Sequence, residues 1–131
     1  RTYSWTLRKL IMKVRFTDRF IRCRLSLEDV LSLEMNSNIA LVLPFLAQSF
    51  SISLSSMEDI SKANVRQNNA HLQIDIPREW TRDWANNDRV GFDFMAESSS
   101  GQPLRIVIEK DFPCEHGPDS KSTAGIPTKM D

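Results

Sequence analysis

The sequence is poor in the residues on which several common kinds of functional site depend. It has only four glycines in 131 residues. Neither a P-loop nor Gly-x-Gly-x-x-Gly occurs, which argues against a glycine-rich loop that cradles phosphates. Its two cysteines, Cys23 and Cys114, lie far apart, so they do not form the framework of a disulfide-rich secreted protein. No apolar run approaches the length of a membrane span, and we expect no membrane contact.

Chemistry that needs clustered ligands or nucleophiles is not indicated either. Cys114 and His116 would need two further metal ligands from elsewhere in the chain. Cys23 and His71 are available, but no paired ligand spacing occurs, so we predict no metal site and no cofactor. Serine, histidine and acidic residues are present without the elbow motif that supports a catalytic triad.

The two ends of the chain differ from its centre in composition. Residues 1–11 hold one short apolar cluster and no small-residue cleavage site, so no signal peptide is predicted and we expect a cytoplasmic protein. Met12 opens the first patterned strand, and we interpret residues 1–11 as an N-terminal extension. Residues 113–131 are rich in Pro, Gly, Ser and Lys, which indicates a flexible tail that could carry a protein contact. One domain is predicted between them, in residues 12–112.

Charge is balanced overall but is unevenly spread along the chain. There are 17 basic and 17 acidic residues. Residues 1–25 hold eight basic residues and one acid, whereas residues 26–64 hold five acids and one base. A basic end with an acidic remainder can be neutralised within the fold or can meet a polyanion. Both alternatives remain open from the sequence.

The strongest pattern lies in residues 12–25, MKVRFTDRFIRCRL, which predict a β-hairpin with one apolar and one basic face. Side chains alternate between the two faces of a strand, so Val14 and Phe16 share the apolar face. We expect Asp18 and Arg19 to form the turn. A slip of one residue would mix the two faces, so the pattern itself sets the register.

Four cations share the basic face of this hairpin. In the expected register Arg15 lies opposite Arg22, and Lys13 lies opposite Arg24. Like charges directly opposite each other are destabilising by roughly 0.2–1 kcal/mol per pair. The four cations therefore need anions nearby, either from a ligand or from this chain. The candidate partners within the chain are Asp93, Glu109 and Asp111.

A short helix and two strands follow the hairpin. Ser26 with an acid three residues on, Asp29, resembles a capping box and predicts a helix start. The helix should end by residues 36–38. Residues 38–43 are apolar and β-branched enough for a strand, and residues 50–54 alternate between apolar residues and serine, as a half-buried strand does.

The second half of the chain reads in the same order. Residues 63–76 predict a hairpin with Asn68 and Asn69 in the turn, because asparagine tolerates positive φ. Pro77 then opens a short helix. Trp80 and Trp84 are four residues apart, so we place both on one helical face as core anchors. Strands are predicted over residues 90–94 and 104–112.

These correspondences predict an internal duplication of a β-β-α-β-β unit, with copies at about residues 12–56 and 63–112. A hairpin alone is marginal in water, so each copy needs the other to bury its apolar face. The predicted fold is one α+β domain, mostly antiparallel, with two short helices and pseudo-two-fold symmetry. A shift of 51 residues pairs Val14 with Val65, Ile21 with Leu72 and Ile39 with Val90, and a shift of 54 pairs Ile52 with Ile106.

Three segments carry a resemblance to a family of small uncharacterised bacterial proteins. Residues 12–15 read MKVR, residues 21–26 read IRCRLS, and residues 104–112 read LRIVIEKDF with Cys114 following. The pattern MKxR, IRxRL, IEKDFxC is similar to that of the family, which implies no known activity. This chain differs in having Asp18 and Arg19 where the family tends to have Gly-Asn, and in lacking an acidic, Pro- and Asn-rich ending.

Residues 74–94, IDIPREWTRDWANNDRVGFDF, carry a more distant resemblance to the swapped-hairpin DNA-binding domains of MazE-type antitoxins and transition-state regulators. In those proteins two chains interlock and basic residues of the first hairpin meet DNA. The resemblance implies that Arg15 and Arg24 occupy comparable places here. The second copy has Gln73 and Asp75 where the first has arginines, so the basic face is not mirrored.

From these observations we predict a non-enzymatic binding protein whose partner is nucleic acid, bound through the four cations of the first hairpin. One alternative is an enzyme that handles anions or phosphates on the same basic face, with Glu109 or Asp111 as a base. The other is a protein-interaction module whose charges are neutralised internally. The oligomeric state remains open from the sequence.

Overall fold

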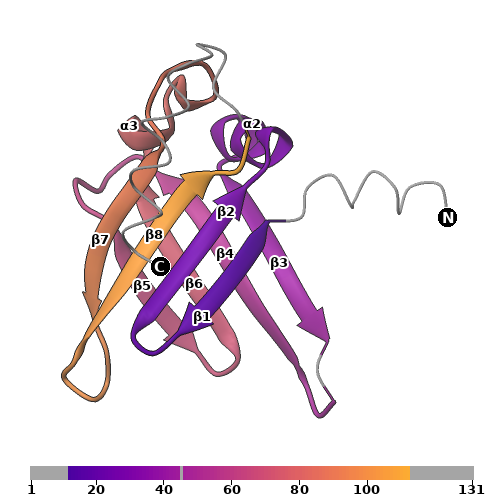
Figure 1. Cartoon of the computed structure of the whole chain (residues 1–131), viewed down its shortest axis with the longest axis vertical. Coiled ribbons are helices and arrows are strands. Elements are labelled where there is room, and N and C mark those ends of the chain that lie inside the picture. The colour runs from indigo at the N-terminus through magenta and orange to yellow at the C-terminus, as the bar shows by residue number, and fades with distance from the viewer. Residues whose placement is uncertain (1–11, 45, 113–131) are drawn as a thin grey trace, which may run out of the picture.

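In a computed structural model, the structure describes residues 12–44 and 46–112. The predicted extension and tail, residues 1–11 and 113–131, lie outside the described residues. Within the described residues, two short α-helices (Figure 1) and one 3-10 turn interrupt the strands. The elements are β1 (Lys13–Thr17), β2 (Phe20–Leu25), α2 (Leu27–Asn36), β3 (Asn38–Pro44), β4 (Ser49–Met57), β5 (Asn64–Asn68), β6 (His71–Pro77), α3 (Arg78–Thr81), η1 (Trp84–Asn86), β7 (Gly91–Glu97) and β8 (Pro103–Lys110).

The strands form two four-stranded sheets. Sheet A has the order β1-β2-β8-β7, and sheet B has the order β3-β4-β6-β5. Each sheet consists of two antiparallel hairpins that are joined through a parallel pair, β2 with β8 or β4 with β6. The helices α2 and α3 lie together at one end of the sheets (Figure 1). The α+β class is confirmed, and both sheets are mixed because of the two parallel pairs.

The first hairpin forms in the predicted register. Arg15 pairs with Arg22 and Lys13 pairs with Arg24. Asp18 and Arg19 form the turn, and Arg19 takes a positive φ of 61°. The second hairpin, by contrast, turns one residue later than predicted. Its turn is Asn69–Ala70, with Asn69 at a φ of 55°, so Asn68 pairs with His71 as the last residue of β5.

Helix α2 begins and ends as the sequence predicts. The Ser26 side chain accepts a hydrogen bond from the Asp29 backbone at 3.1 Å, and the Asp29 carboxylate accepts one from the Ser26 backbone at 2.9 Å. This is the predicted capping box, which satisfies two N–H groups that have no partner within the helix. Ser37 ends the helix in the left-handed conformation, at a φ of 66°.

The prediction that Trp80 and Trp84 share a helical face is wrong. Helix α3 ends at Thr81, and Trp84 belongs to the separate turn η1. The chain between them changes direction at Asp83, which has a positive φ of 59°. Both rings nevertheless contact Phe92, with centroid distances of 4.9 Å for Trp80 and 4.7 Å for Trp84. They act as core residues through this shared neighbour.

One apolar core joins the inner faces of the two sheets and the helices. The alternating apolar residues of β2, β4, β6 and β8 are almost fully buried in it. On the edge strand β1, by contrast, Val14 is half-buried and Phe16 is exposed. No helix among the described residues is long and apolar enough to cross a membrane. The core residues at 0% exposure are Cys23, Leu25, Val30, Leu33, Ile52, Leu54, Ile74, Ile76, Trp84, Ile106 and Ile108.

Asp29 of the capping box should give stability a measurable pH dependence. Burial raises the pKa of its carboxyl above the usual 3.8, against the hydrogen bonds from Ser26, which lower it. The folded state therefore holds the proton more tightly than the unfolded state, so ionisation of Asp29 weakens the fold as pH rises through the raised pKa. As the pH rises from 3.8 to the raised pKa, we expect the free energy of unfolding of D29N to increase relative to that of the wild type. Urea unfolding at a series of pH values measures this difference. A difference that is constant with pH, or that falls, would contradict this assignment.

Candidate functional site

The outer face of sheet A brings the cations of the first hairpin beside Glu109 of the last strand and Asp111, which follows that strand. Because β2 runs parallel to β8, Arg22 is in register with Val107, and Arg24 is in register with Glu109. These side chains alternate with core residues such as Cys23 and Ile108, and they point away from the core. The site therefore joins residues that are more than eighty positions apart in the sequence.

Arg22 and Glu109 form a buried ion pair at the centre of this face. Nε and Nη2 of Arg22 lie 2.8 and 2.7 Å from the same oxygen, Oε2 of Glu109. The two side chains are only 5% and 3% exposed. The other oxygen, Oε1 of Glu109, is buried and accepts no hydrogen bond from the part of the chain that the structure describes. Buried charges are costly unless they are paired, so this contact holds β2 and β8 together electrostatically.

Asp111 binds two of the remaining cations. Its Oδ1 lies 2.9 Å from Nη2 of Arg24, and its Oδ2 lies 2.9 Å from Nζ of Lys13. Arg24 is also 3.4 Å from Oε2 of Glu109. Lys13 and Arg24 remain 73% and 42% exposed at the side chain. These outer contacts are thus open to solvent, where ion pairs contribute little to stability.

Asp93 does not join the cations for which it was a candidate partner. It forms a two-point contact with Arg105 instead, at 3.1 Å to Nε and 2.6 Å to Nη2. The hydrogen bond to Asp93 raises the pKa of the Arg105 guanidinium. In the antiparallel β7–β8 pair, Asp93 is opposite Val107, which places it diagonal to Arg105 on the same face.

The four cations of the first hairpin line a shallow hollow on the outer face. Its volume is about 400 Å³, and its walls are Lys13, Val14, Arg15, Arg22 and Arg24. We call it the basic hollow. Arg15 and Lys13 are exposed at its rim, whereas Arg22 is buried at 4% exposure. A concave surface lined by cations concentrates positive potential, which favours anionic groups.

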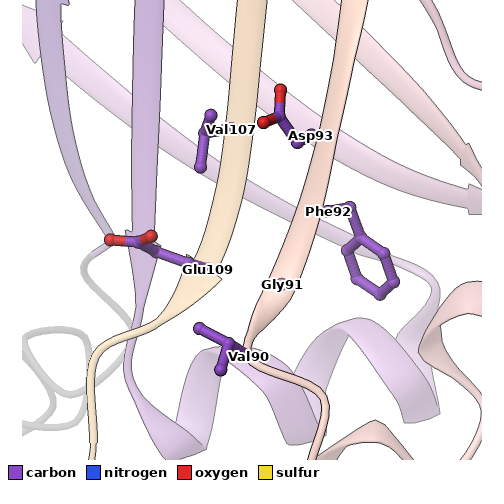
Figure 2. Close-up of a pocket in the computed structure, with 6 residues that line it drawn as sticks. All are labelled: Val90, Gly91, Phe92, Asp93, Val107 and Glu109. Atoms are coloured by element: carbon purple, nitrogen blue, oxygen red, sulfur yellow. The ribbon is translucent and has the colours of Figure 1, made fainter. Parts of the chain in front are cut away.

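A second hollow of about 240 Å³ lies over β7 and β8, bounded by Val90, Gly91, Phe92, Asp93, Val107 and Glu109 (Figure 2). Figure 2 shows Glu109 extending from β8 towards β2, while the ring of Phe92 points to the other side of β7. A Cβ atom on Gly91 would lie 2.2 Å from the backbone oxygen of Ile108. Only glycine fits there, and it allows β7 and β8 to approach closely next to the buried ion pair.

The outer face of sheet B carries a polar network that the sequence did not suggest. Ser51 Oγ lies 2.6 Å from Nδ1 of His71, and Gln73 Oε1 lies 3.3 Å from Nε2 of the same ring. Gln73 also donates to Asp75 at 3.0 Å, and Asp75 pairs with Arg66 at 2.9 Å. The parallel register of β4 with β6 brings these side chains together, and no short stretch of the sequence indicates that register.

Comparison with families of known sequences shows which family the chain belongs to. Residues 12–126 match a family of unknown function, DUF7009. The chain belongs to this family. The DUF7009 match begins at Met12, the residue that opens the first patterned strand. Searches among curated proteins and among solved structures gave no match, so neither supports the resemblance to MazE-type antitoxins. No group of three or more His, Cys, Asp or Glu residues able to hold a metal ion occurs within residues 12–44 and 46–112.

Proposed function

We propose that this DUF7009 protein is a non-enzymatic binding protein whose basic hollow accepts the phosphate groups of nucleic acid. The observation that carries the proposal is the concavity itself: four cations from two strands line one hollow of about 400 Å³. Phosphate contacts from Lys and Arg supply most of the non-specific affinity of proteins for nucleic acid.

The internal carboxylates are consistent with a weak, salt-sensitive site. Asp111 neutralises Lys13 and Arg24 only through partly exposed contacts. A polyanion can therefore compete for these cations at low ionic strength, where surface charges are least screened. The buried Arg22–Glu109 pair stays closed and supports the floor of the hollow.

The test is the salt dependence of binding to fluorescently labelled single-stranded and duplex oligonucleotides, followed by anisotropy. The double variant K13Q/R15Q should bind more weakly, and the slope of log affinity against log salt should fall by about 0.7–0.9 for each phosphate contact that is lost. The matched control is R66Q, which removes an exposed cation from β5 of sheet B. Absence of binding by the wild type at low salt, or equal losses in both variants, would refute the proposal.

We also propose that the two halves of the chain are copies of one unit, and the strand registers support this. In β2–β8, Phe20 pairs with Arg105 and Leu25 with Lys110. In β6–β4, His71 pairs with Ser51 and Ile76 with Ser56. Shifts of 51 and 54 residues convert the first set into the second. The third strands correspond with a shift of 53, which pairs Ile39 with Phe92 rather than with Val90.

This symmetry relates the proposal to the swapped-hairpin resemblance. Each sheet takes one hairpin from each half of the chain, as expected if two copies interlock. Under the shifts, Arg22 and Glu109 of sheet A correspond to Gln73 and Ser55 of sheet B, which contact each other at 2.7 Å. A shared position therefore holds an ion pair in one sheet and a neutral hydrogen bond in the other.

A protein-interaction module with neutralised charges is the second candidate. The ion pairs of Lys13, Arg22 and Arg24 with Glu109 and Asp111 favour it. It predicts no measurable affinity for oligonucleotides even at low salt, so the same titration separates the two candidates.

A further inference from the structure

The outer face of sheet A also presents an aromatic ring, that of Phe20, beside the cations. Phe20 is the first residue of β2 and is half-buried. It shares its face with Arg22 and Arg24, because Ile21 and Cys23 between them point into the core. An aromatic residue on the outer face of a sheet, with part of its ring open to solvent, is available for contact with a ligand.

Arg105 supports this ring from the neighbouring strand. Its guanidinium carbon lies 5.9 Å from the centroid of Phe20, and the two residues are in register across β2 and β8. The contact of Arg105 with Asp93 fixes the guanidinium in place. The Phe20 ring has no aromatic partner among the described residues, in contrast to Phe16, which packs edge-on against Phe50 at 6.0 Å.

Phe20 and the basic hollow are arranged along one strand. A strand rises about 3.3 Å per residue, so Phe20, Arg22 and Arg24 follow one another at intervals of roughly 7 Å. A single strand of nucleic acid that runs along β2 can stack a base on the Phe20 ring and place its phosphates over the basic hollow. Aromatic stacking together with a positively charged groove is how proteins hold single strands without reading their sequence.

We propose that the ligand class of this face is single-stranded nucleic acid, with Phe20 as the stacking platform. This inference rests on the proposed function and narrows it. In a duplex the base faces are occupied by neighbouring bases, so Phe20 could contribute only after a base is unstacked, which costs free energy. The basic hollow alone would bind both forms through their phosphates.

The experiment compares a labelled oligonucleotide as a single strand and annealed to its complement, titrated with the full chain by anisotropy at low salt. The wild type should bind the single strand more tightly. F20A should weaken single-strand binding about 5- to 100-fold and leave duplex binding within twofold. F20L keeps the apolar volume but lacks the flat ring, and it should lose the same preference. Circular dichroism checks that each variant is folded.

The control is F16A, which removes an aromatic ring that is 47% exposed on the opposite face of β1. It should leave the ratio of single-strand to duplex affinity unchanged. Equal affinities of the wild type for both forms, or a wild-type preference in F20L, would overturn the inference while leaving the proposed nucleic-acid binding intact. If the wild type binds neither the single strand nor the duplex, both this inference and the proposed nucleic-acid binding are refuted.

Discussion

Replacement of Glu109 by alanine should lower the free energy of unfolding by about 3–5 kcal/mol, because it removes the carboxylate that faces the buried Arg22. Arg22 is 5% exposed at the side chain and directs both Nε and Nη2 to one oxygen of Glu109. Without that oxygen, the buried guanidinium of Arg22 loses the carboxylate that offsets much of its desolvation between β2 and β8. Urea unfolding, followed by circular dichroism, measures the loss.

The same sheet provides a matched control in the Asp93–Arg105 pair. In it Arg105 also directs two nitrogens to one carboxylate, but these side chains are 45% and 40% exposed. D93A should therefore cost less than about 1 kcal/mol. In addition, the double variant R22M/E109L should recover most of the stability lost in E109A, because apolar replacement of a buried ion pair is often neutral or stabilising. Equal losses in E109A and D93A would show that burial does not govern the strength of the pair.

Replacement of Trp84 by alanine should cost about 3–5 kcal/mol. The residue is 0% exposed, its ring contacts Phe92 at 4.7 Å, and its Nε1 donates a hydrogen bond of 2.8 Å to the backbone oxygen of Arg89. The substitution removes the largest fully buried side chain among residues 12–44 and 46–112 and deprives that carbonyl of the indole hydrogen bond. Thermal unfolding should show a large decrease in midpoint temperature.

Replacement of Trp80 tests whether the loss of stability depends on how deeply the tryptophan is buried or only on the loss of a tryptophan. Its ring is half-buried and stacks on the same Phe92 at 4.9 Å, with an interplanar angle of 16°. W80A should cost clearly less than W84A, because solvent already reaches part of the ring. A larger loss in W80A would contradict the view that Trp84 anchors the helical end of the core.

Local patterns were sufficient for those parts of the fold that depend on neighbouring residues. Alternation along β1 and β2 with a two-residue turn leaves a single register in which Val14 and Phe16 share a face with Ile21 and Cys23. Arg15 does lie opposite Arg22. The capping box of Ser26 and Asp29 is likewise complete within four residues. The predicted turn of the second hairpin lies one residue too early, because Asn68 and Asn69 both suit a positive φ. Only the pairing of β5 with β6 shows which of them is in the turn.

The candidate site could be predicted in its residues but not in its contacts. The opposed cations required anions, and Glu109 and Asp111 do contact three of the four. The match of Asp93 with Arg105 depends on the register of β7 with β8, and the position of Phe20 beside Arg105 depends on the parallel pair. Such pairings follow from the packing of the whole chain, so no short window of sequence contains them.

The pairing of β2 with β8 has a consequence for how the protein is made. All strands of sheet B lie within residues 38–77, whereas sheet A needs the first and the last strands of the fold. At the usual rate of synthesis, β8 leaves the ribosome on the order of ten seconds after β2. During this interval the nascent chain can complete sheet B, while the first hairpin has an open edge and Arg22 has not yet met Glu109. The order of synthesis therefore makes every strand of sheet B available before sheet A can be completed.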